Sequence, residues 1–318
     1  MKRILIVLLA LLLCASCALA DIVVEVGGKR MERMDATREY NRLLREGKKA
    51  QALEIMYALA RAGDLNAMYS VGMANVDEER LYWLEYAAMD GHTGAMLALY
   101  EEYQYTNEEL ALHYLKEAAA GGDTDACYLL GELYLFGGMG IEPDYDKARP
   151  LIRAAADERD CRAMYYVAYG KEHGLYGYAR DEAAAASTYM FLWEIGDTEC
   201  WQYGEALDNL GKMYEDGRGV RRDDEMAFEL YEQAHQHVMN CGPLLKMARM
   251  HAEGRGTKQD VRRAWEILDA LRDDAPGYDG DWAYLMGLMY HNGYGTQKNK
   301  TLAEAYFEQA QEWGVSLW

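Results

Sequence analysis

The densest group of residues that could do chemistry lies in the stretch HQHVMNC, which contains His235, His237 and Cys241. Imidazole and thiolate groups are ligands that Zn²⁺ prefers, and His251 follows in the same region. Side chains two apart on a helix, such as His235 and His237, do not face each other. We therefore expect a polar helix end here, with no metal site and no cofactor.

Other catalytic signals are weak. Carboxylates are abundant, as in DDE at 223–225, so a pair of acids does not mark a site. The chain contains neither the serine-nucleophile motif GxSxG nor the metalloprotease motif HExxH. The glycine pair Gly217 and Gly219 could belong to a phosphate-binding loop, but no strand precedes it and no Lys-Ser/Thr follows it.

The same glycine pair returns at nearly fixed intervals. LGKMYEDGRGVRRDDEMAFELYEQA (210–234), MARMHAEGRGTKQDVRRAWEILDA from 247 and MGLMYHNGYGTQKNKTLAEAYFEQA from 286 share one frame. Such a period indicates a repeat architecture. We expect the paired glycines to end one helix in the left-handed conformation. The acids that follow should cap the next helix; they are Asp144, Asp224 and Asp260.

Each repeat is predicted to contain two helices. The first carries a glycine in its interior, as at Gly131, Gly211 and Gly287, where close helix packing would offset the low helix propensity of glycine. The second has small and apolar residues at i, i+3 and i+7, which mark one buried helical face. An earlier helix pair is predicted over 36–63. Only DIVVEV at 21–26 has the pattern of a strand, in an N-terminal tail.

The frame resembles that of the Sel-one-like repeat family, a relative of the tetratricopeptide repeats. ALDNLGKMYEDGRGVRRDDEMA (206–227) matches the family frame nearly throughout, and the resemblance covers about 64–318. The first two units lack the glycine loop, and the stretch 170–186 is longer than the frame. The fold implied is an all-α, right-handed α-solenoid of about eight antiparallel helix pairs. The segment 21–63 would be a tail and a capping helix pair.

The resemblance implies an interaction module that binds a protein or peptide segment in a concave groove. In the related tetratricopeptide family the groove is lined by free positions of the first helices, here three before and one after the interior glycine. Tyrosines at such positions suit peptide or glycan recognition, although some rings could instead fill space between repeats. The groove residues predicted in this way are Tyr128, Tyr165, Tyr169, Lys212, Arg249 and Tyr284.

An enzymatic alternative also comes from the family. Hydrolysis of peptidoglycan-like or β-lactam substrates has been associated with its cysteine-rich members. The repeats here offer no nucleophile–base pair, so we predict a non-enzymatic adaptor. The formal net charge of −20 repels phosphate backbones, which excludes nucleic acid as a partner and leaves a basic protein or peptide. We expect a monomer.

The first twenty residues have the features of a secretory signal peptide. MKR is a basic start, ILIVLLALLLC an apolar segment too short to span a membrane, and ALA a small-residue cleavage site before Asp21. We therefore expect a periplasmic or secreted protein without a membrane span. The alternative is a lipoprotein anchored at Cys17.

Export favours disulfide formation among the four cysteines that remain after cleavage. Cys127 and Cys161 fall on first helices of neighbouring repeats and are the predicted pair. Cys200 and Cys241 are expected to be free or buried. The alternative is that all four are small packing residues.

Overall fold

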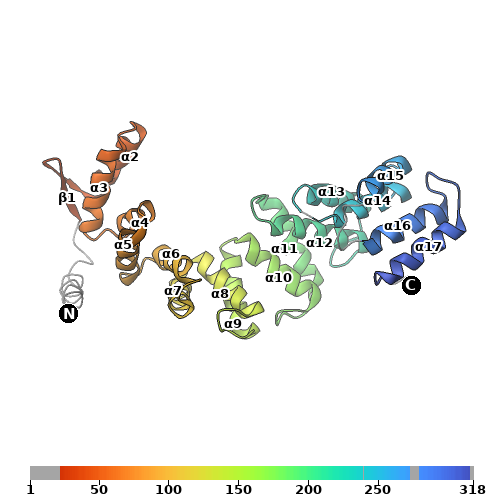
Figure 1. Ribbon diagram of the computed structural model, residues 1–318, viewed down its shortest axis with the longest axis horizontal. Helices are drawn as coiled ribbons and strands as arrows, with labels where there is room; N and C mark the ends of the chain where they lie inside the picture. The colour runs from red at the N-terminus through yellow and green to blue at the C-terminus, as the bar shows by residue number, and fades with distance from the viewer. Residues whose placement is uncertain (1–21, 239, 273–278, 316–318) are drawn as a thin grey trace. The chain divides into compact units, whose positions relative to one another are not determined.

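The computed structural model describes residues 22–238, 240–272 and 279–315 (Figure 1). These residues form sixteen α-helices and one two-stranded hairpin, which confirms the predicted all-α fold class. None of the helices in the described part of the chain has the length and apolar character needed to cross a membrane. The predicted signal peptide at 1–20 and the alternative lipid anchor at Cys17 lie outside the described residues.

The helices follow one another in eight pairs, so that every even-numbered helix is the first of a pair and every odd-numbered helix the second. The chain divides into two compact units, Met1–Leu130 and Gly131–Trp318, with the division inside α8 (Thr124–Phe136). The first unit contains α2 (Arg33–Arg45), α3 (Lys49–Arg61), α4 (Leu65–Ala74), α5 (Asp77–Met89), α6 (Thr93–Tyr103) and α7 (Glu108–Ala120). The second contains α9 (Tyr145–Asp157), α10 (Cys161–His173), α11 (Glu182–Ile195), α12 (Gln202–Asp216), α13 (Asp224–His235), α14 (Gly242–Glu253), α15 (Val261–Ala270), α16 (Asp279–Asn292) and α17 (Lys300–Glu312).

The N-terminal segment is more ordered than a tail. Strand β1 (Val23–Val26) was predicted, but it pairs antiparallel with a second strand, β2 (Lys29–Glu32), which was not. Val24 and Met31 face each other across the hairpin and are both buried in the core of the first unit. The second strand was missed because KRME is almost entirely charged and has a single buried side chain.

The paired glycines end the first helices, as predicted. Gly217 is the C-cap of α12 with φ of 70°, and its N–H donates to the carbonyl of Met213. Gly219 also lies in the left-handed region, at φ 68°. A Cβ at this position would lie 2.2 Å from the carbonyl oxygen of Glu182, on the second helix of the preceding pair. The second glycine is therefore needed for close approach between repeats as well as for the turn.

The second helices begin at aspartate caps, with one correction to the prediction. Asp144 and Asp260 cap α9 and α15 by accepting backbone N–H bonds. For α13, however, the cap is Asp223, which accepts from the N–H groups of Glu225 and Met226. Asp224 is the first residue inside that helix and is bound instead by Arg222 and Arg255. Two adjacent acids made the cap ambiguous in the sequence.

The interior glycines bring the two helices of a pair together. A Cβ at Gly211 would lie 2.7 Å from the ring of Tyr231, and one at Gly131 would lie 2.8 Å from Ile152. Ala227, Leu230 and Ala234 on α13 are fully buried, as their i, i+3, i+7 spacing predicted. Close helix contact over small residues therefore builds the core of the second unit.

Candidate functional site

A cavity of about 430 Å³ lies in the second unit, among the first helices of three successive pairs, α12, α14 and α16. Its wall contains carboxylates, cationic side chains, leucines and one tyrosine. The lining residues are Asp208, Lys212, Glu215, Asp216, Gly242, Leu245, Lys246, Arg249, Asp281, Tyr284 and Leu285.

Most of the charges in this cavity are held in pairs. The Lys246 ammonium donates to both carboxylate oxygens of Asp208, at 2.6 Å each, and lies 5.0 Å from the centre of a buried tyrosine ring on α13. The Arg249 guanidinium donates to Glu215. Lys212 on α12 and Asp281 on α16 are exposed. The paired charges shape the wall, and these two exposed groups are available to a ligand.

The glutamate that holds Arg249 belongs to a contact that repeats along the chain. Glu215 is 7% exposed and accepts hydrogen bonds from the Tyr231 hydroxyl at 2.9 Å and from the Arg255 guanidinium at 3.0 Å. Tyr231 lies on the second helix of the same pair, whereas Arg255 lies in the glycine loop of the next pair. Burial, together with the neighbouring Glu215 carboxylate, raises the pKa of Tyr231 well above its usual value, so its hydroxyl stays a donor.

The preceding pair contains the same arrangement. Glu172 on α10 is 2% exposed and accepts from Tyr189 at 3.2 Å and from Arg218 at 2.9 Å. Arg218 again lies between the two glycines of the next loop. We name this set the Glu–Tyr–Arg contact. It joins two helices of one pair to the loop of the next pair and satisfies a buried carboxylate in doing so.

In the pair that follows, all three positions of the contact are apolar or aromatic. Ala252 stands in place of the glutamate and Leu268 in place of the tyrosine, and both are buried. Tyr294 replaces the loop arginine and packs against the same core cluster. All three positions are thus different in this pair, and no buried carboxylate is left there without its arginine, which would be costly.

A cluster of aromatic rings surrounds two of the predicted groove residues. The rings of Tyr165 and Tyr169 are stacked with their centres 5.8 Å apart. The centre of the Tyr176 ring lies 6.3 Å from that of Tyr169 and 6.0 Å from that of Tyr166. Tyr176 has φ of 56°, unusual for a residue other than glycine, and comes from the stretch 170–186 that is longer than the repeat frame. Burial raises the pKa of Tyr165 above its usual range.

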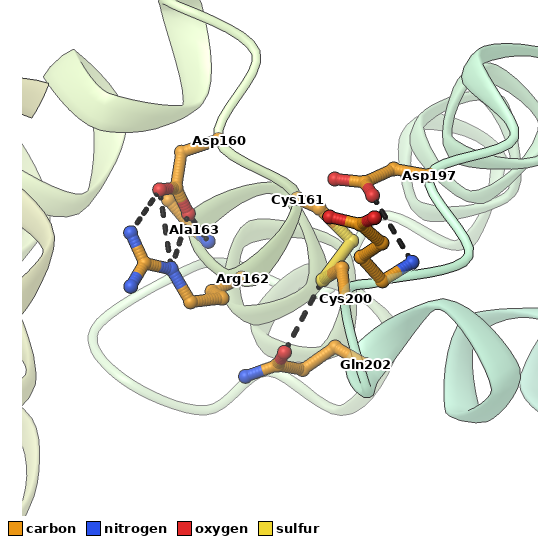
Figure 2. The surroundings of a disulfide bond; sticks show 8 residues. Asp160, Cys161, Arg162, Ala163, Asp197, Cys200 and Gln202 are labelled. Carbon is orange, nitrogen blue, oxygen red and sulfur yellow. Dashed lines mark hydrogen bonds and ion pairs between the residues drawn. A yellow bond between two sulfur atoms is a disulfide. The ribbon is translucent and has the colours of Figure 1, made fainter. Parts of the chain in front are cut away.

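A disulfide joins Cys161 and Cys200, with their Cα atoms 6.4 Å apart (Figure 2). Cys161 is the first residue of α10, and Cys200 lies in the loop between α11 and α12. The predicted Cys127–Cys161 pairing is therefore wrong. Cys127 is a buried thiol whose Sγ lies 3.5 Å from the carbonyl oxygen of Ala119 on α7, so it faces its preceding helix.

The histidine-rich stretch forms ring contacts rather than a gathered set of ligands. His235 is exposed at the end of α13, and the ring of His237 lies edge-on to Tyr203, with centres 5.2 Å apart. His251 packs against the ring of Phe228 at 5.0 Å, and burial lowers its pKa. Within the described ranges, the donor atoms that gather closely enough for a metal ion belong to Cys161, Asp197 and Cys200.

Six segments of the chain match the Sel1 repeat: 96–123, 124–160, 161–187, 204–234, 244–269 and 283–310. The chain belongs to the Sel1 repeat family. Members of this family are typically protein-interaction scaffolds. Most of the matched segments contain one first helix and one second helix, and the pair α4 and α5 precedes the first match.

Solved structures show the same fold. The crystal structure of c5321, a protective antigen of uropathogenic Escherichia coli strains that displays an SLR fold, aligns with a TM-score of 0.61 and 22% identity. The alignment covers 82% of this chain and 56% of that one, so this chain spans little more than half of c5321. A Sel1 repeat protein from Oxalobacter formigenes aligns with a TM-score of 0.53 and 22% identity, covering 82% and 86% of the two chains. No curated protein matches this chain.

Three of the six predicted groove residues line the cavity between α12, α14 and α16. Lys212, Arg249 and Tyr284 all line it, and so do Asp208 and Leu245, which occupy the same repeat positions. These side chains come together because equivalent positions on successive first helices project to one face. Their role in binding a partner stays a prediction.

The other three predicted residues lie elsewhere. Tyr128 is 4% exposed, and its buried ring leaves almost no surface for a ligand. Tyr165 is half-buried and packs on the core of the second unit, and Tyr169 lies beside it in the aromatic cluster. For Tyr128 and Tyr165 the alternative, that rings at these positions fill space, describes the structure better. Repeat position alone does not reveal which rings a neighbouring helix covers.

Sequence reasoning missed Glu215, Asp216 and Asp281 in the cavity and also missed the Glu–Tyr–Arg contact. A signal for the contact is present, since Glu172 and Glu215 both lie two residues before the glycine that ends their helix. An arginine stands between the two glycines of the following loop in both cases. Reading the frame across neighbouring Sel1 repeats, rather than within one repeat, would have found it.

Proposed function

We propose that this Sel1 repeat protein is an exported, monomeric and non-enzymatic adaptor that holds a basic segment of a partner protein in the cavity between α12, α14 and α16. The observation that carries the proposal is the convergence of free repeat positions from three successive first helices on one cavity. Repeat scaffolds use such positions for binding because the frame does not need them for packing.

The chemistry of the cavity supports a basic partner. Lys246 and Arg249 are already paired with Asp208 and Glu215, so their charges are largely compensated. Asp281 and Lys212 remain as exposed charges on the wall. In total the wall has four carboxylates, Asp208, Glu215, Asp216 and Asp281, and three cations, Lys212, Lys246 and Arg249. The chain as a whole has a formal charge of −20, which attracts cationic segments and speeds their encounter.

Tyr284 provides an anchor within this charged surface. It is half-buried, and its ring lies 5.7 Å from that of Phe307 on α17. A half-buried tyrosine with two side-chain torsions offers a large apolar face and a hydroxyl at low entropic cost, both of which suit peptide binding.

Selection of random displayed peptides on the immobilised mature protein tests this proposal. We expect the selected peptides to be enriched in Lys and Arg and to bind more weakly as salt is added. Tyr284→Ala should weaken their binding at least about tenfold, since an aromatic hot-spot residue contributes about 2 kcal/mol or more and tenfold corresponds to about 1.4 kcal/mol. Asp281→Asn should weaken binding and reduce its salt dependence.

The matched control is Glu232→Gln, which removes one exposed carboxylate from the second helix α13. This variant should bind the peptides as the wild type does. Selected peptides without basic residues, or peptides that bind Tyr284→Ala unchanged, would refute the assignment of the cavity.

A further inference from the structure

The surroundings of the disulfide contain a third potential ligand. One ligand atom each from Cys161, Asp197 and Cys200 lie within 4.8 Å of one another, and Figure 2 shows the Asp197 side chain beside the two sulfur atoms. In a tetrahedral zinc site, with Zn–S near 2.3 Å and Zn–O near 2.1 Å, ligand atoms lie roughly 3.4–3.8 Å apart. The three donors are therefore close enough to share one ion once the sulfur atoms separate.

We propose that Cys161, Asp197 and Cys200 form a Zn²⁺ site when the Cys161–Cys200 disulfide is reduced. Two thiolates and one carboxylate are a suitable donor set for zinc, with water in the fourth position. Oxidation to the disulfide closes this site, so zinc binding reports the redox state of the pair.

The position of the two cysteines allows the site to open. Cys161 begins α10, whereas Cys200 lies in a loop, so the second sulfur can move without shifting a helix. A surface cavity of about 340 Å³ is bounded by both cysteines, by Asp197 and by their neighbours. A small thiol and a hydrated ion can therefore reach the sulfur atoms.

Gln202 gives independent support for a reduced state. Its side chain is fully buried, and its Oε1 lies 3.3 Å from the Sγ of Cys200 (Figure 2). A disulfide sulfur has no proton, so this contact is a hydrogen bond only when Cys200 is a thiol. The Gln202 Nε2 has no hydrogen-bond partner among the described residues. Oxidation thus leaves the buried Oε1 without this donor, and reduction to the thiol restores it. The unpartnered Nε2 is itself a donor and is not satisfied by the thiol proton.

The start of α10 favours the ligating form of Cys161. The unpaired N–H groups of a helix N-terminus stabilise a thiolate, and the thiolate is both the metal ligand and the attacking group in disulfide exchange. Arg162 pairs with the N-cap Asp160, which compensates the negative charge of this adjacent carboxylate. The buried amide supports the reduced dithiol, and the helix end and the third donor support its conversion to a metal-binding pair of thiolates.

The reaction balances as an ordinary exchange. A dithiol reductant transfers two electrons to the Cys161–Cys200 bond, becomes a disulfide itself, and leaves two protein thiols. Zn²⁺ then displaces one proton from each thiol and binds the two thiolates. Oxidation reverses both steps and releases the ion.

Zinc titration of the full mature chain tests the proposal. After reduction and removal of the reductant without oxygen, wild-type protein should bind one Zn²⁺ in competition with a chromophoric chelator. Co²⁺ in its place should give a thiolate-to-cobalt charge-transfer band. Oxidised wild-type protein should bind no ion at this site, and re-oxidation of the zinc-bound form should release it.

Two variants separate this site from other thiols and from misfolding. Cys161→Ser/Cys200→Ser keeps Cys127 and Cys241 and should lose the stoichiometric ion. Asp197→Asn leaves the disulfide intact and should weaken zinc binding at least about tenfold in the reduced state. Two outcomes would overturn the proposal. The reduced wild-type protein could bind no more zinc than the double serine variant, or it could bind zinc only as tightly as Asp197→Asn does.

Discussion

Replacing Gly211 by alanine should destabilise the second unit, whereas the same change at Gly287 should be nearly neutral. Both glycines occupy the same position of a first helix, where alanine improves helix propensity by about 1 kcal/mol. The new methyl group would be closer to its neighbour at 287, 2.4 Å from the ring of Phe307, than at 211, 2.7 Å from the ring of Tyr231. Distance alone would therefore predict the opposite order.

The freedom of the neighbouring ring decides the outcome. Tyr231 is 0% exposed and its hydroxyl is held by Glu215 at 2.9 Å, so it cannot turn away. Overpacking of this kind costs about 1–3 kcal/mol, which leaves a net loss of roughly 1 kcal/mol after the propensity gain. Phe307 is only half-buried and can rotate towards solvent. A strained rotamer costs about 0.5–1.5 kcal/mol, which the propensity gain offsets.

Equilibrium urea unfolding followed by circular dichroism would measure both changes under identical conditions. We expect the midpoint for Gly211→Ala to fall clearly below that of the wild type, and the midpoint for Gly287→Ala to stay close to it. If Gly211→Ala proves as stable as Gly287→Ala, the buried ring is free to move and the packing argument is wrong.

Three further predictions concern the polar contacts and the disulfide. Glu215→Ala should lower the free energy of unfolding by about 3 kcal/mol, the low end for breaking a buried ion pair, because the two guanidinium groups that lose their partner are partly exposed. Exchanging the whole Glu–Tyr–Arg contact for the Ala, Leu and Tyr of the next pair should recover most of the loss in the same urea assay, and no recovery would count against coupling of the three positions. Hydrogen bonds from Arg255 and Arg222 lower the pKa of Asp224 from 3.8 to about 2, so the stabilising effect of this carboxylate is present above pH 3.8 and disappears as pH falls through about 2. Asp224→Asn should therefore show a smaller acid-induced drop in melting temperature than the wild type over this range, and equal drops would contradict the assignment. Reduction of the Cys161–Cys200 disulfide, whose cysteines are 39 residues apart in the chain, should lower the free energy of unfolding by about 3–4 kcal/mol in the absence of metal. An unchanged melting temperature after reduction would show that the cross-link does not restrain the unfolded chain.

The sequence by itself determined the repeating unit of this protein. The left-handed glycine at 217, the aspartate caps at 144 and 260 and the buried alanines of α13 were all predictable. These features depend on interactions within a few residues of one another, such as a helix cap or one helical face. The hydrophobic spacing within one repeat is therefore enough to predict the helices and the turns between them.

The tertiary structure decided which side chains of successive repeats meet. It placed Lys212, Arg249 and Tyr284 around one cavity but buried Tyr128 in the first unit. It also paired Cys161 with Cys200, because the loop before α12 returns to the start of α10. Such contacts depend on the distance and rotation between helices that are tens of residues apart in the chain. A frame that describes one repeat at a time contains no information about that geometry.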